Sequence, residues 1–549
     1  MNCALPKIKL HGLLGDALQR SCNNRLKKID YKQLVEPFRL RNENDGAWRC
    51  EFWGKIVRSA ILTNFYLQDQ SLAQQIEDTV NDIISTQSAD GCISSYPENL
   101  QLSRWDIWGR KYVLLGLLRY YELVKQDEKV RNCCIRMLDH LMNQISSGDK
   151  VFTVYGEHTG LAASSILGAV VGVYRISKEK RFLDFARKIV NSGCSVRNNI
   201  FEAVLKGVPP RELGNGKAYE MTSCFQGLAE LYMLDPNPLY KDICEKYFRA
   251  VSEQEIFITG TGGGKDRWGE FWDNGVINQT ASDYQGGLGE TCVTTTWLHY
   301  CERVSDITLD NSPFDEAERS FYNAILGAMS PNGSRWMHIN PTPLTGNGKK
   351  LAAGDQILIS CGSAFGGHDC CRAQGPEALA LAPRMAVVKR KNSIDLNLFE
   401  PLDAEIDDDI KISISGNYPL EPSAKIKVFA EKEINLRIRM SSFVKNVTLN
   451  GEKQNFKAGT YFSISRKWQS DDVLMIEFDF SVREIASPDG AGYSAFMHGP
   501  LVLAEDSRID VPDALIKIKH RNHNLVDYIS AGNLMCEENT LTVWFKNNN

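Results

Sequence analysis

The sequence predicts a mainly helical domain, built as a toroid of α/α hairpins, followed by an antiparallel β-sandwich. Apolar residues recur at helical spacing from about residue 48 to residue 381, and short polar or Gly/Pro breaks separate the helical segments. After about Arg384 the apolar residues follow a period of two instead. We therefore expect a helical domain over residues 1–385 and a β-sandwich over residues 386–549.

Ten segments carry the helical pattern, and one or two more at the ends would bring the total to as many as twelve. The predicted helices cover residues 52–67, 71–86, 105–125, 129–146, 160–176, 180–192, 219–234, 239–254, 288–304 and 313–328. The stretch 112–120 (YVLLGLLRY) is apolar on most sides, so this helix must pack between other helices. A closed ring of hairpins meets this requirement, and an open helical solenoid is the competing arrangement.

The strands expected after residue 384 are short and evenly spaced. They cover residues 394–398, 410–414, 424–429, 434–438, 461–464 and 473–478. Asn450-Gly451 is a typical hairpin turn, and short strands joined by such turns favour an antiparallel sandwich.

Composition excludes several classes of protein. The 549 residues include 63 basic and 68 acidic side chains, and this net charge of −5 argues against a nucleic-acid-binding protein. The longest apolar runs, 112–118 and 164–173, fall short of the ~20 residues that span a bilayer, so no membrane segment is expected. Residues 1–16 do not resemble a secretory signal, which predicts a cytoplasmic protein, or a periplasmic one if a signal peptide has been removed.

Fifteen cysteines are scattered without a repeated spacing, so most should be reduced and buried. Two short motifs are exceptions, Glu290-Thr291-Cys292 and Cys370-Cys371. Together they offer one carboxylate and three thiolates, the number and type of donors that a tetrahedral zinc site needs. If a helix begins near residue 288, Glu290 and Cys292 lie in its first turn and point toward one place.

The adjacent cysteines reach one metal only if the chain turns there. Gly366-Gly367 before the pair and Gly375-Pro376 after it would permit such a turn. His368 and Asp369 are rival ligands on the same segment. The other interpretation is a vicinal cysteine pair that has no relation to the buried Cys292.

The loop over residues 259–273 (TGTGGGKDRWGEFWD) contains a candidate general acid, Glu270. A phosphate-loop interpretation is weak, because Lys265 is followed by Asp266 and not by Ser or Thr. Aromatic neighbours such as Trp268 would raise the pKa of the Glu270 carboxyl by desolvation, and aromatic rings also stack on sugars. The competing interpretation is a solvated loop carboxylate.

Polar and aromatic residues inside apolar helical stretches are candidates for the lining of a central cavity. Trp108, His158 and Tyr219 occupy such positions, in the stretches 105–110, 157–158 and 217–220. Helix ends in a toroid open onto the central cavity, where a ligand would bind. Each of these residues has an alternative role as a helix cap or a hydrogen-bonded core group.

Several segments together resemble glycoside hydrolase family 127, the β-L-arabinofuranosidase-like family. They are WRCEFWGK (48–55), WDIWGRKYVLLGLL (105–118), HTGLAASSIL (158–167), KAYEMTSCFQGLAELY (217–232), GEFWD (269–273), GETC (289–292), HDCCRAQGPEALALAPR (368–384) and AFMHGPLVLAED (495–506). The resemblance extends over nearly the whole chain, and GETC with the downstream cysteine pair is its most specific part.

The resemblance implies an (α/α)6 barrel followed by a β-sandwich, and a Zn²⁺ ion bound by Glu290, Cys292, Cys370 and Cys371. It also implies that Cys370 is the nucleophile of a retaining mechanism and that Glu270 is the acid/base. The implied substrate is a glycan of plant polysaccharide or glycoprotein, from which the enzyme releases a terminal β-L-arabinofuranose-type sugar. His158 would contact sugar hydroxyls, with Trp108, Trp268 and Tyr219 as further candidates; a homodimer is one option for the assembly.

One departure from the family pattern bears on the substrate. Better-known members carry prolines directly after the cysteine pair, whereas this chain has Arg372-Ala373-Gln374. A cation beside the nucleophile would suit an acidic branched sugar of pectic side chains (aceric-acid type), unless Arg372 points to solvent.

Two other classes compete with a hydrolase. A non-catalytic carbohydrate-binding protein with structural zinc predicts a closed site without room beside Cys370. A toroid lyase or isomerase acting on uronates would use Tyr219 and His158 as bases and no thiolate. The hydrolase is preferred because it alone accounts for Glu270, GETC and the cysteine pair together.

Overall fold

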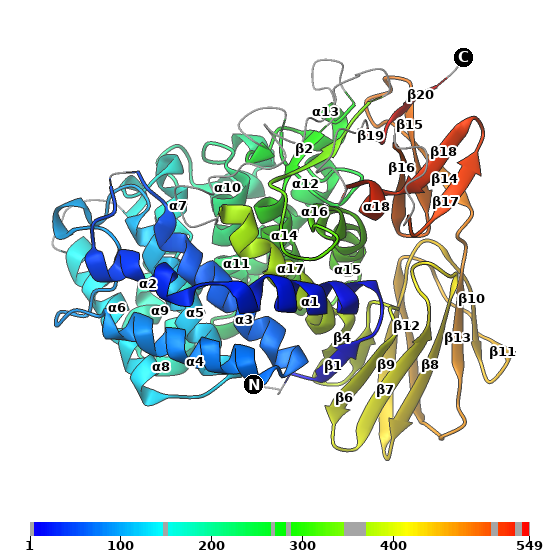
Figure 1. The fold of residues 1–549 in the computed structure, drawn as a ribbon, viewed down its shortest axis with the longest axis horizontal. Coiled ribbons are helices and arrows are strands. Elements are labelled where there is room, and N and C mark those ends of the chain that lie inside the picture. The colour runs from blue at the N-terminus through cyan, green and yellow to red at the C-terminus, as the bar shows by residue number, and fades with distance from the viewer. Residues whose placement is uncertain are drawn as a thin grey trace.

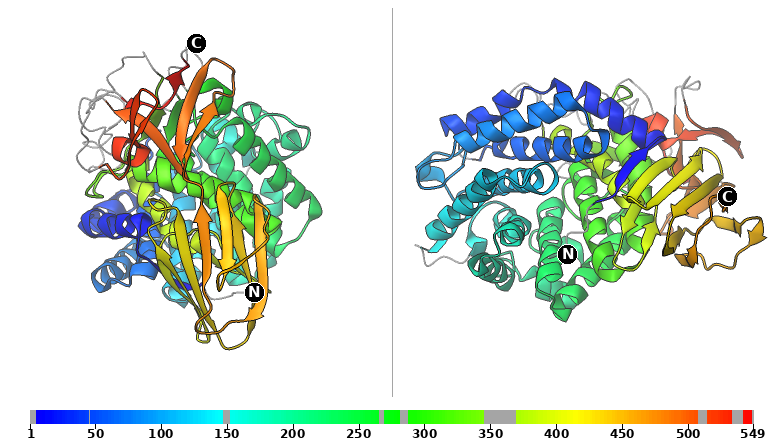
Figure 2. Two further views of the ribbon diagram at one scale, coloured as in Figure 1. Left: turned by 90° about the vertical axis from the view of Figure 1, so that its right-hand side faces the viewer. Right: turned by 90° about the horizontal axis from the view of Figure 1, so that it is seen from below.

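The computed structural model describes residues 5–44, 46–146, 152–264, 269–280, 287–344, 369–506, 514–532 and 541–547. Helices occupy one side of the molecule and β-sheets the other (Figure 1), and the two further views agree (Figure 2). The predicted order, a helical region followed by a β-rich region, is confirmed.

Within the described residues, six helices form a closed inner ring. They are α3 (Phe52–Leu67), α5 (Asp106–Leu123), α8 (Leu167–Ser177), α11 (Ala218–Leu234), α14 (Thr291–Thr308) and α17 (Cys370–Ala386). Each packs on the next, and α17 packs on α3, which closes the ring. The closed toroid is confirmed and the open solenoid is wrong.

A second layer of helices covers the ring from outside. It comprises α4 (Gln70–Ser85), α6 (Glu128–Ser146), α9 (Lys180–Asn191), α12 (Pro238–Gln254), α15 (Ser312–Arg319) and α1 (Leu13–Asn24). The outer α9 buries one face only, whereas the inner α5 is buried on nearly every side. This difference is the one that the sequence of 112–120 predicts.

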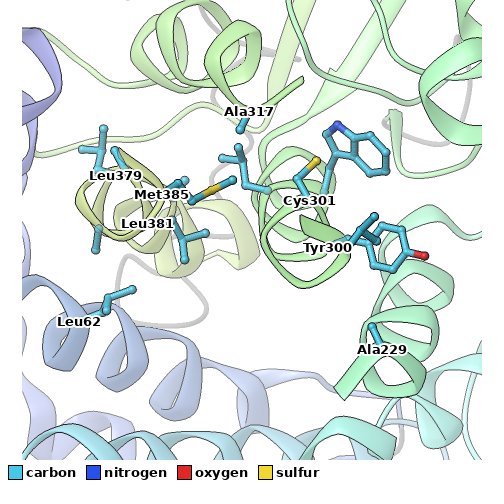
Figure 3. Close-up of a cluster of buried hydrophobic side chains, with 14 of the residues drawn as sticks. Leu62, Ala229, Tyr300, Cys301, Ala317, Leu379, Leu381 and Met385 are labelled. Carbon is cyan, nitrogen blue, oxygen red and sulfur yellow. The ribbon is translucent and has the colours of Figure 1, made fainter. Parts of the chain in front are cut away.

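Apolar side chains from neighbouring ring helices meet in one continuous core. Figure 3 shows Leu62 of α3, Tyr300 and Cys301 of α14, and Leu379 and Met385 of α17 in this core, and all are fully buried. The stretch His158–Ser177 is apolar enough to match a membrane span, but 72% of its most apolar window is buried inside the protein, as expected for a helix of the ring.

One expected helix begins later than predicted. Residues 288–290 belong to strand β2 (Gly287–Glu290), which pairs antiparallel with β3 (Ile339–Thr342). Helix α14 begins at Thr291. Gly289 explains the difference, because a side chain there would collide with Thr261, and an extended strand lets the backbone approach this neighbour.

The sandwich consists of two sheets. The larger has the strand order β1-β6-β7-β8-β13-β10-β11 and the smaller β12-β9-β5-β4. The strands are β1 (Lys7–Leu10), β4 (Val387–Lys389), β5 (Ile394–Leu396), β6 (Leu402–Asp407), β7 (Ile410–Gly416), β8 (Ser423–Ala430), β9 (Glu433–Met440), β10 (Val444–Leu449), β11 (Glu452–Lys453), β12 (Thr460–Lys467) and β13 (Leu474–Phe478). Their pairing is antiparallel except between β5 and β9. The Asn450-Gly451 turn joins β10 and β11 as predicted.

A third sheet follows the sandwich and lies beside the barrel (Figure 1). It contains β14 (Val482–Ala486), β15 (Tyr493–His498), β16 (Leu501–Asp506), β17 (Lys517–His520), β18 (His523–Asp527), β19 (Leu541–Thr542) and β20 (Phe545–Lys546). The short helix α18 (Tyr528–Gly532) packs this sheet against α16 (Leu326–Ala328) of the barrel.

Buried charges join the sandwich to the barrel. Arg439 of β9 is fully buried, and its Nη2 lies 2.6 Å from Glu318 Oε1 of α15. Glu400 accepts hydrogen bonds from the backbone N–H of Leu14 (2.9 Å) and Gly15 (3.0 Å), at the start of α1. The Tyr322 hydroxyl donates a third bond to Glu400 at 3.0 Å. The barrel and the sandwich therefore share a polar interface that depends on complete pairing.

Glu400 makes the stability of this interface depend on pH. Burial raises its carboxyl pKa from 4.5 to about 7. Because the folded pKa is the higher one, the folded state holds a proton that the unfolded state has lost between pH 4.5 and 7, so stability falls as the pH rises through this window. We expect Glu400→Gln to remove about 3 kcal/mol of this decline.

Urea unfolding at several pH values measures the effect. The exposed Glu431→Gln serves as the control and should keep the wild-type pH profile. An unchanged pH profile for Glu400→Gln would contradict the role of Glu400.

Candidate metal centre and active site

Four predicted ligands lie together at one end of the helical ring. Glu290 ends β2, Cys292 lies in the first turn of α14, and Cys370 and Cys371 begin α17. Because α14 and α17 are neighbours in the ring, their N-termini meet, and all four ligand atoms lie within 4.8 Å of one another. The GETC motif and the cysteine pair therefore form one cluster, nearly eighty positions apart in sequence.

The spacing of these atoms fits a tetrahedral metal ion. Zn–S distances of about 2.3 Å and Zn–O distances of about 2.0–2.2 Å place two sulfurs about 3.8 Å apart and a sulfur and an oxygen about 3.6 Å apart. In the structure, Cys371 Sγ lies 3.8 Å from Cys370 Sγ and 3.4 Å from Cys292 Sγ. Glu290 Oε1 lies 3.7 Å from Cys370 Sγ and 3.6 Å from Cys371 Sγ. The chain can therefore hold a metal here, and three sulfur donors favour zinc over a hard cation.

The start of α17 explains how adjacent cysteines reach one point. Asp369 is the N-cap residue, with an extended backbone, and its carboxylate accepts the Arg372 N–H at 2.8 Å. The turn expected beside the cysteines is therefore the first turn of a helix. Asp369 caps this helix and is not among the four ligands; His368, the other rival ligand, lies outside the described residues.

The protonation of the cluster is uneven. Hydrogen bonds from Cys292, Cys371 and His338 hold the pKa of Cys370 well below its usual value. Burial raises the pKa values of the Glu290 carboxyl and the Cys371 thiol. The protein alone thus concentrates negative charge on Cys370, and a bound divalent cation would let all the ligands ionise.

Lys55 lies behind the cluster and was not predicted. Its side chain is completely buried, and its Nζ lies 3.0 Å from Glu51 Oε1 and 3.9 Å from Cys292 Sγ. A buried ammonium needs an opposite charge, and Glu51 provides it. Burial raises the pKa of the Cys292 thiol, so Cys292 would add a second negative charge only with a metal bound. Trp108 completes the arrangement by donating its indole N–H to Glu51 Oε2 at 2.6 Å. Trp108 is buried, and its role as a sugar contact stays a prediction.

Glu270 lies beside the cluster and remains accessible. Its backbone carbonyl accepts the Ala218 N–H at 3.1 Å, which fixes its loop against the start of α11. The Lys217 ammonium donates to the Glu270 carboxylate, and His338 Nε2 lies 3.8 Å from its Oε1. The side chain of Glu270 is 25% exposed.

Only part of the aromatic surroundings expected for Glu270 is found among the described residues. Phe271 is buried beside Lys217, with the Lys217 Nζ 5.1 Å from the ring centre. Trp272 is buried and donates its indole N–H to the Tyr247 hydroxyl, away from Glu270. Trp268 lies outside the described residues, so its predicted contact with sugar is not tested.

His158 and Tyr219 lie at different depths. His158 is half-buried, packs edge-on against Trp105 and Phe271, and has its Nε2 3.9 Å from Glu220 Oε1. The Tyr219 side chain is buried, and its hydroxyl donates to Gln374 Oε1. His158 is thus the more accessible of the two predicted sugar contacts.

Arg372 is engaged by its own helix. Its Nε lies 3.1 Å from Asp369 Oδ2, and its side chain is 16% exposed. The alternative in which Arg372 points freely to solvent is therefore wrong. The Asp369 carboxylate therefore balances the positive charge of the Arg372 guanidinium, the charge expected to favour an acidic sugar.

His338 is the functional candidate that sequence reasoning missed. It is buried, and its Nδ1 lies 3.5 Å from Cys371 Sγ and 3.8 Å from Cys370 Sγ. Burial lowers its pKa, but the hydrogen bond to Cys370 and the nearby negative charges outweigh this effect and raise the pKa to about 10. No periodic pattern or recognised motif surrounds His338 in the sequence, so nothing there marks it as a site residue.

Comparisons with known proteins agree with this architecture. The family model for the β-L-arabinofuranosidase GH127 catalytic domain matches residues 14–384, and that for the GH127 middle domain matches residues 393–480. A non-reducing end β-L-arabinofuranosidase of Bifidobacterium longum subsp. longum is 19% identical over an alignment 341 residues long, which covers 59% of this chain. The match covers 50% of that enzyme, so the chain spans about half the length of this relative.

Two solved structures share the fold. The crystal structure of a GH127 β-L-arabinofuranosidase from Geobacillus stearothermophilus T6 aligns with a TM-score of 0.75 and 16% identity, covering 98% of this chain and 100% of that one. A GH127 β-arabinofuranosidase aligns with a TM-score of 0.78 and 17% identity, covering 99% of this chain and 97% of that one.

The family models place this chain in a class of glycoside hydrolases, and the fold agrees with the (α/α)6 barrel of that class. The chain belongs to glycoside hydrolase family 127, the β-L-arabinofuranosidase family. Its buried Glu and Cys group is consistent with the metal site expected from the sequence.

We expect Lys55→Met to destabilise the protein. The substitution leaves Glu51 buried without its cationic partner, which costs about 3–5 kcal/mol. Urea unfolding of the variant measures this cost. The double variant Lys55→Met/Glu51→Gln removes both charges and should recover part of the lost stability; a single variant as stable as the wild type would show that the pair is unimportant.

Proposed function

We propose that this chain is a retaining, zinc-dependent glycosidase that releases a terminal β-L-arabinofuranose-type sugar from plant polysaccharide or glycoprotein glycans. Cys370 acts as the nucleophile and Glu270 as the acid/base. Glu290, Cys292, Cys370 and Cys371 hold the zinc. The names of the similar arabinofuranosidases support the choice of sugar.

One observation carries the assignment of roles. Glu290, Cys292 and Cys371 are buried, whereas Cys370 and Glu270 are only partly buried. A substrate can therefore reach the two groups that need to touch it. The other three ligands have positions suited to holding a metal only.

The first step forms a bond between the Cys370 sulfur and the anomeric carbon. A lone pair of the thiolate attacks this carbon, the glycosidic C–O bond breaks, and a protonated Glu270 gives its proton to the departing oxygen. The hydrogen bonds that lower the pKa of Cys370 keep its thiol ionised before the attack.

The second step reverses the roles. The Glu270 carboxylate removes a proton from a water molecule, whose oxygen attacks the anomeric carbon and breaks the C–S bond. The electron pair returns to the Cys370 sulfur as a thiolate. Two displacements at one carbon retain its configuration.

Lys217 and His338 position Glu270 for both steps. Lys217 donates to one carboxylate oxygen, and His338 lies near the other. This arrangement fixes the plane of the carboxyl group beside the cluster. When bound, zinc supplies positive charge that keeps its thiolate ligands deprotonated and lowers their basicity.

The accessible Cys370 also bears on the other classes of function. A purely structural zinc site is closed, with all its ligands buried. Here Cys370 is partly exposed beside a carboxylate. A lyase using Tyr219 as a base has less support, because the Tyr219 hydroxyl is buried and hydrogen-bonded.

We expect Cys370→Ser to abolish turnover and to weaken zinc binding. A serine hydroxyl is a poorer nucleophile and a poorer zinc ligand than a thiolate. The measurements are hydrolysis of p-nitrophenyl β-L-arabinofuranoside and zinc content by elemental analysis. Cys301→Ala, which changes a buried cysteine elsewhere on α14, should keep both. Full turnover by folded Cys370→Ser would exclude Cys370 as the nucleophile.

We expect Glu270→Gln to retain zinc and to lose hydrolysis of glycosides with poor leaving groups. General acid/base assistance contributes about 10²–10⁴-fold, so the loss should fall in this range. Comparing an unactivated disaccharide with the p-nitrophenyl glycoside separates the acid role, because the activated leaving group needs less protonation. The exposed Glu452→Gln is the control. Equal losses on the two substrates would argue against the acid role.

A further inference from the structure

His338 occupies a fixed place beside the cysteine cluster. It directly precedes β3, whose partner strand β2 ends at Glu290, and Ile339 pairs with Glu290 in the register of the two strands. The Thr291 N–H donates to the His338 carbonyl at 3.0 Å. The same strand pair therefore positions both the Glu290 carboxylate and the His338 ring.

The ring nitrogen that faces the cysteines has the spacing of a metal ligand. A sulfur and a nitrogen on one tetrahedral zinc ion lie about 3.6 Å apart. His338 Nδ1 lies 3.5 Å from Cys371 Sγ and 3.8 Å from Cys370 Sγ. His338, Glu290 and Glu270 also form a second group whose ligand atoms lie within 4.8 Å of one another.

The other ring nitrogen is placed as in known metal-bound histidines. Such a histidine usually directs its second N–H at a carboxylate, which orients the ring and raises its basicity. His338 Nε2 lies 3.8 Å from Glu270 Oε1. This distance is longer than a hydrogen bond, so Glu270 is near the ring as the carboxylate of such an arrangement would be, without a direct bond.

The proposed reaction would leave the metal short of one strong ligand while Cys370 is bonded to the sugar. While the Cys370 sulfur is bonded to the sugar it is a neutral thioether, which donates to zinc more weakly than a thiolate. Glu290, Cys292 and Cys371 would then be the three strong donors left to hold a zinc ion, which prefers four.

We propose that His338 is a further ligand of this centre and takes the place of Cys370 while the Cys370 sulfur is bonded to the sugar. The exchange involves no oxidation. The Nδ1 proton, which His338 donates to the Cys370 thiolate, passes to solvent water when the sulfur bonds to the sugar; the Nδ1 lone pair then becomes available and the second ring proton stays on Nε2. When the C–S bond breaks, the Cys370 thiolate returns and Nδ1 takes a proton back from water. The inference rests on the proposed role of Cys370 as nucleophile.

The test measures metal binding in proteins that lack the Cys370 sulfur. Zinc affinity is determined by competition with a chromophoric chelator for wild type, His338→Phe, Cys370→Ala and the double variant. Phenylalanine keeps the ring volume and removes the nitrogen donors. Co²⁺ absorption spectra of the same proteins report the coordination geometry and the number of thiolate ligands.

We expect His338→Phe to weaken zinc binding much more in the Cys370→Ala background than in the wild type. The further loss in the double variant should exceed about 100-fold, the upper end of what a residue outside the ligand shell contributes. Co²⁺ in Cys370→Ala should keep tetrahedral bands, and these bands should disappear in the double variant. Equal or smaller losses in the Cys370→Ala background would overturn the proposal.

Two further variants serve as a control and as a replacement. His140→Phe is the matched control, because His140 also faces a carboxylate, with its Nε2 3.2 Å from Asp90 Oδ2, but lies on the outer helix α6. It should leave zinc affinity and Co²⁺ spectra unchanged in both backgrounds. If His338→Phe does not fold, His338→Asn replaces it.

Separate measurements distinguish a failure of this inference from a failure of the proposed catalytic roles. Zinc affinity and Co²⁺ spectra decide whether His338 is a ligand, whereas the turnover of Cys370→Ser decides whether Cys370 is the nucleophile. A His338-dependent metal site in a Cys370 variant with full turnover would keep the ligand assignment and remove its catalytic purpose.

Discussion

Closure of the helical ring is the constraint on which the site depends. Glu290 and Cys292 lie at the start of α14, and Cys370 and Cys371 lie at the start of α17. Only packing of these neighbouring helices brings their N-termini together. Helix N-termini also carry partial positive charge, which favours thiolates and carboxylates there. The ring therefore supplies both the position of the ligands and a partial positive charge beside them.

Charged side chains of opposite sign alternate around the cysteine cluster. Four ionised ligands around a divalent cation would leave a net negative charge, and the ammonium of Lys55, 3.9 Å from Cys292 Sγ, would oppose it. Glu51 balances Lys55 in turn, and Trp108 donates to Glu51. On the open side, Lys217 pairs with Glu270. The buried charges of Lys55 and Glu51 are thus tolerated because each is the opposite partner of the other.

The sequence predicts the ring and the ligand set better than it predicts the surroundings of the ligands. Helical periodicity is strong in an inner helix that is apolar on most sides, and Cys370-Cys371 is a rare donor pattern. Lys55 is hidden because one lysine within an apolar helix resembles an ordinary amphipathic position. His338 lies at the edge of a four-residue strand, too short to give a period. Its role depends on a strand pairing that local sequence does not encode.

The N-terminal segment has a consequence for how the chain folds. Strand β1 pairs with β6, almost 400 positions away, and α1 packs on α17 and is held at its start by Glu400. During synthesis the ring cannot close until its last helix, α17, has been made, and β1 cannot pair until β6 of the sandwich has been made. Until then, apolar inner helices are exposed to other chains. This topology predicts slow, late closure and a reliance on chaperones that a locally connected helical bundle would not have.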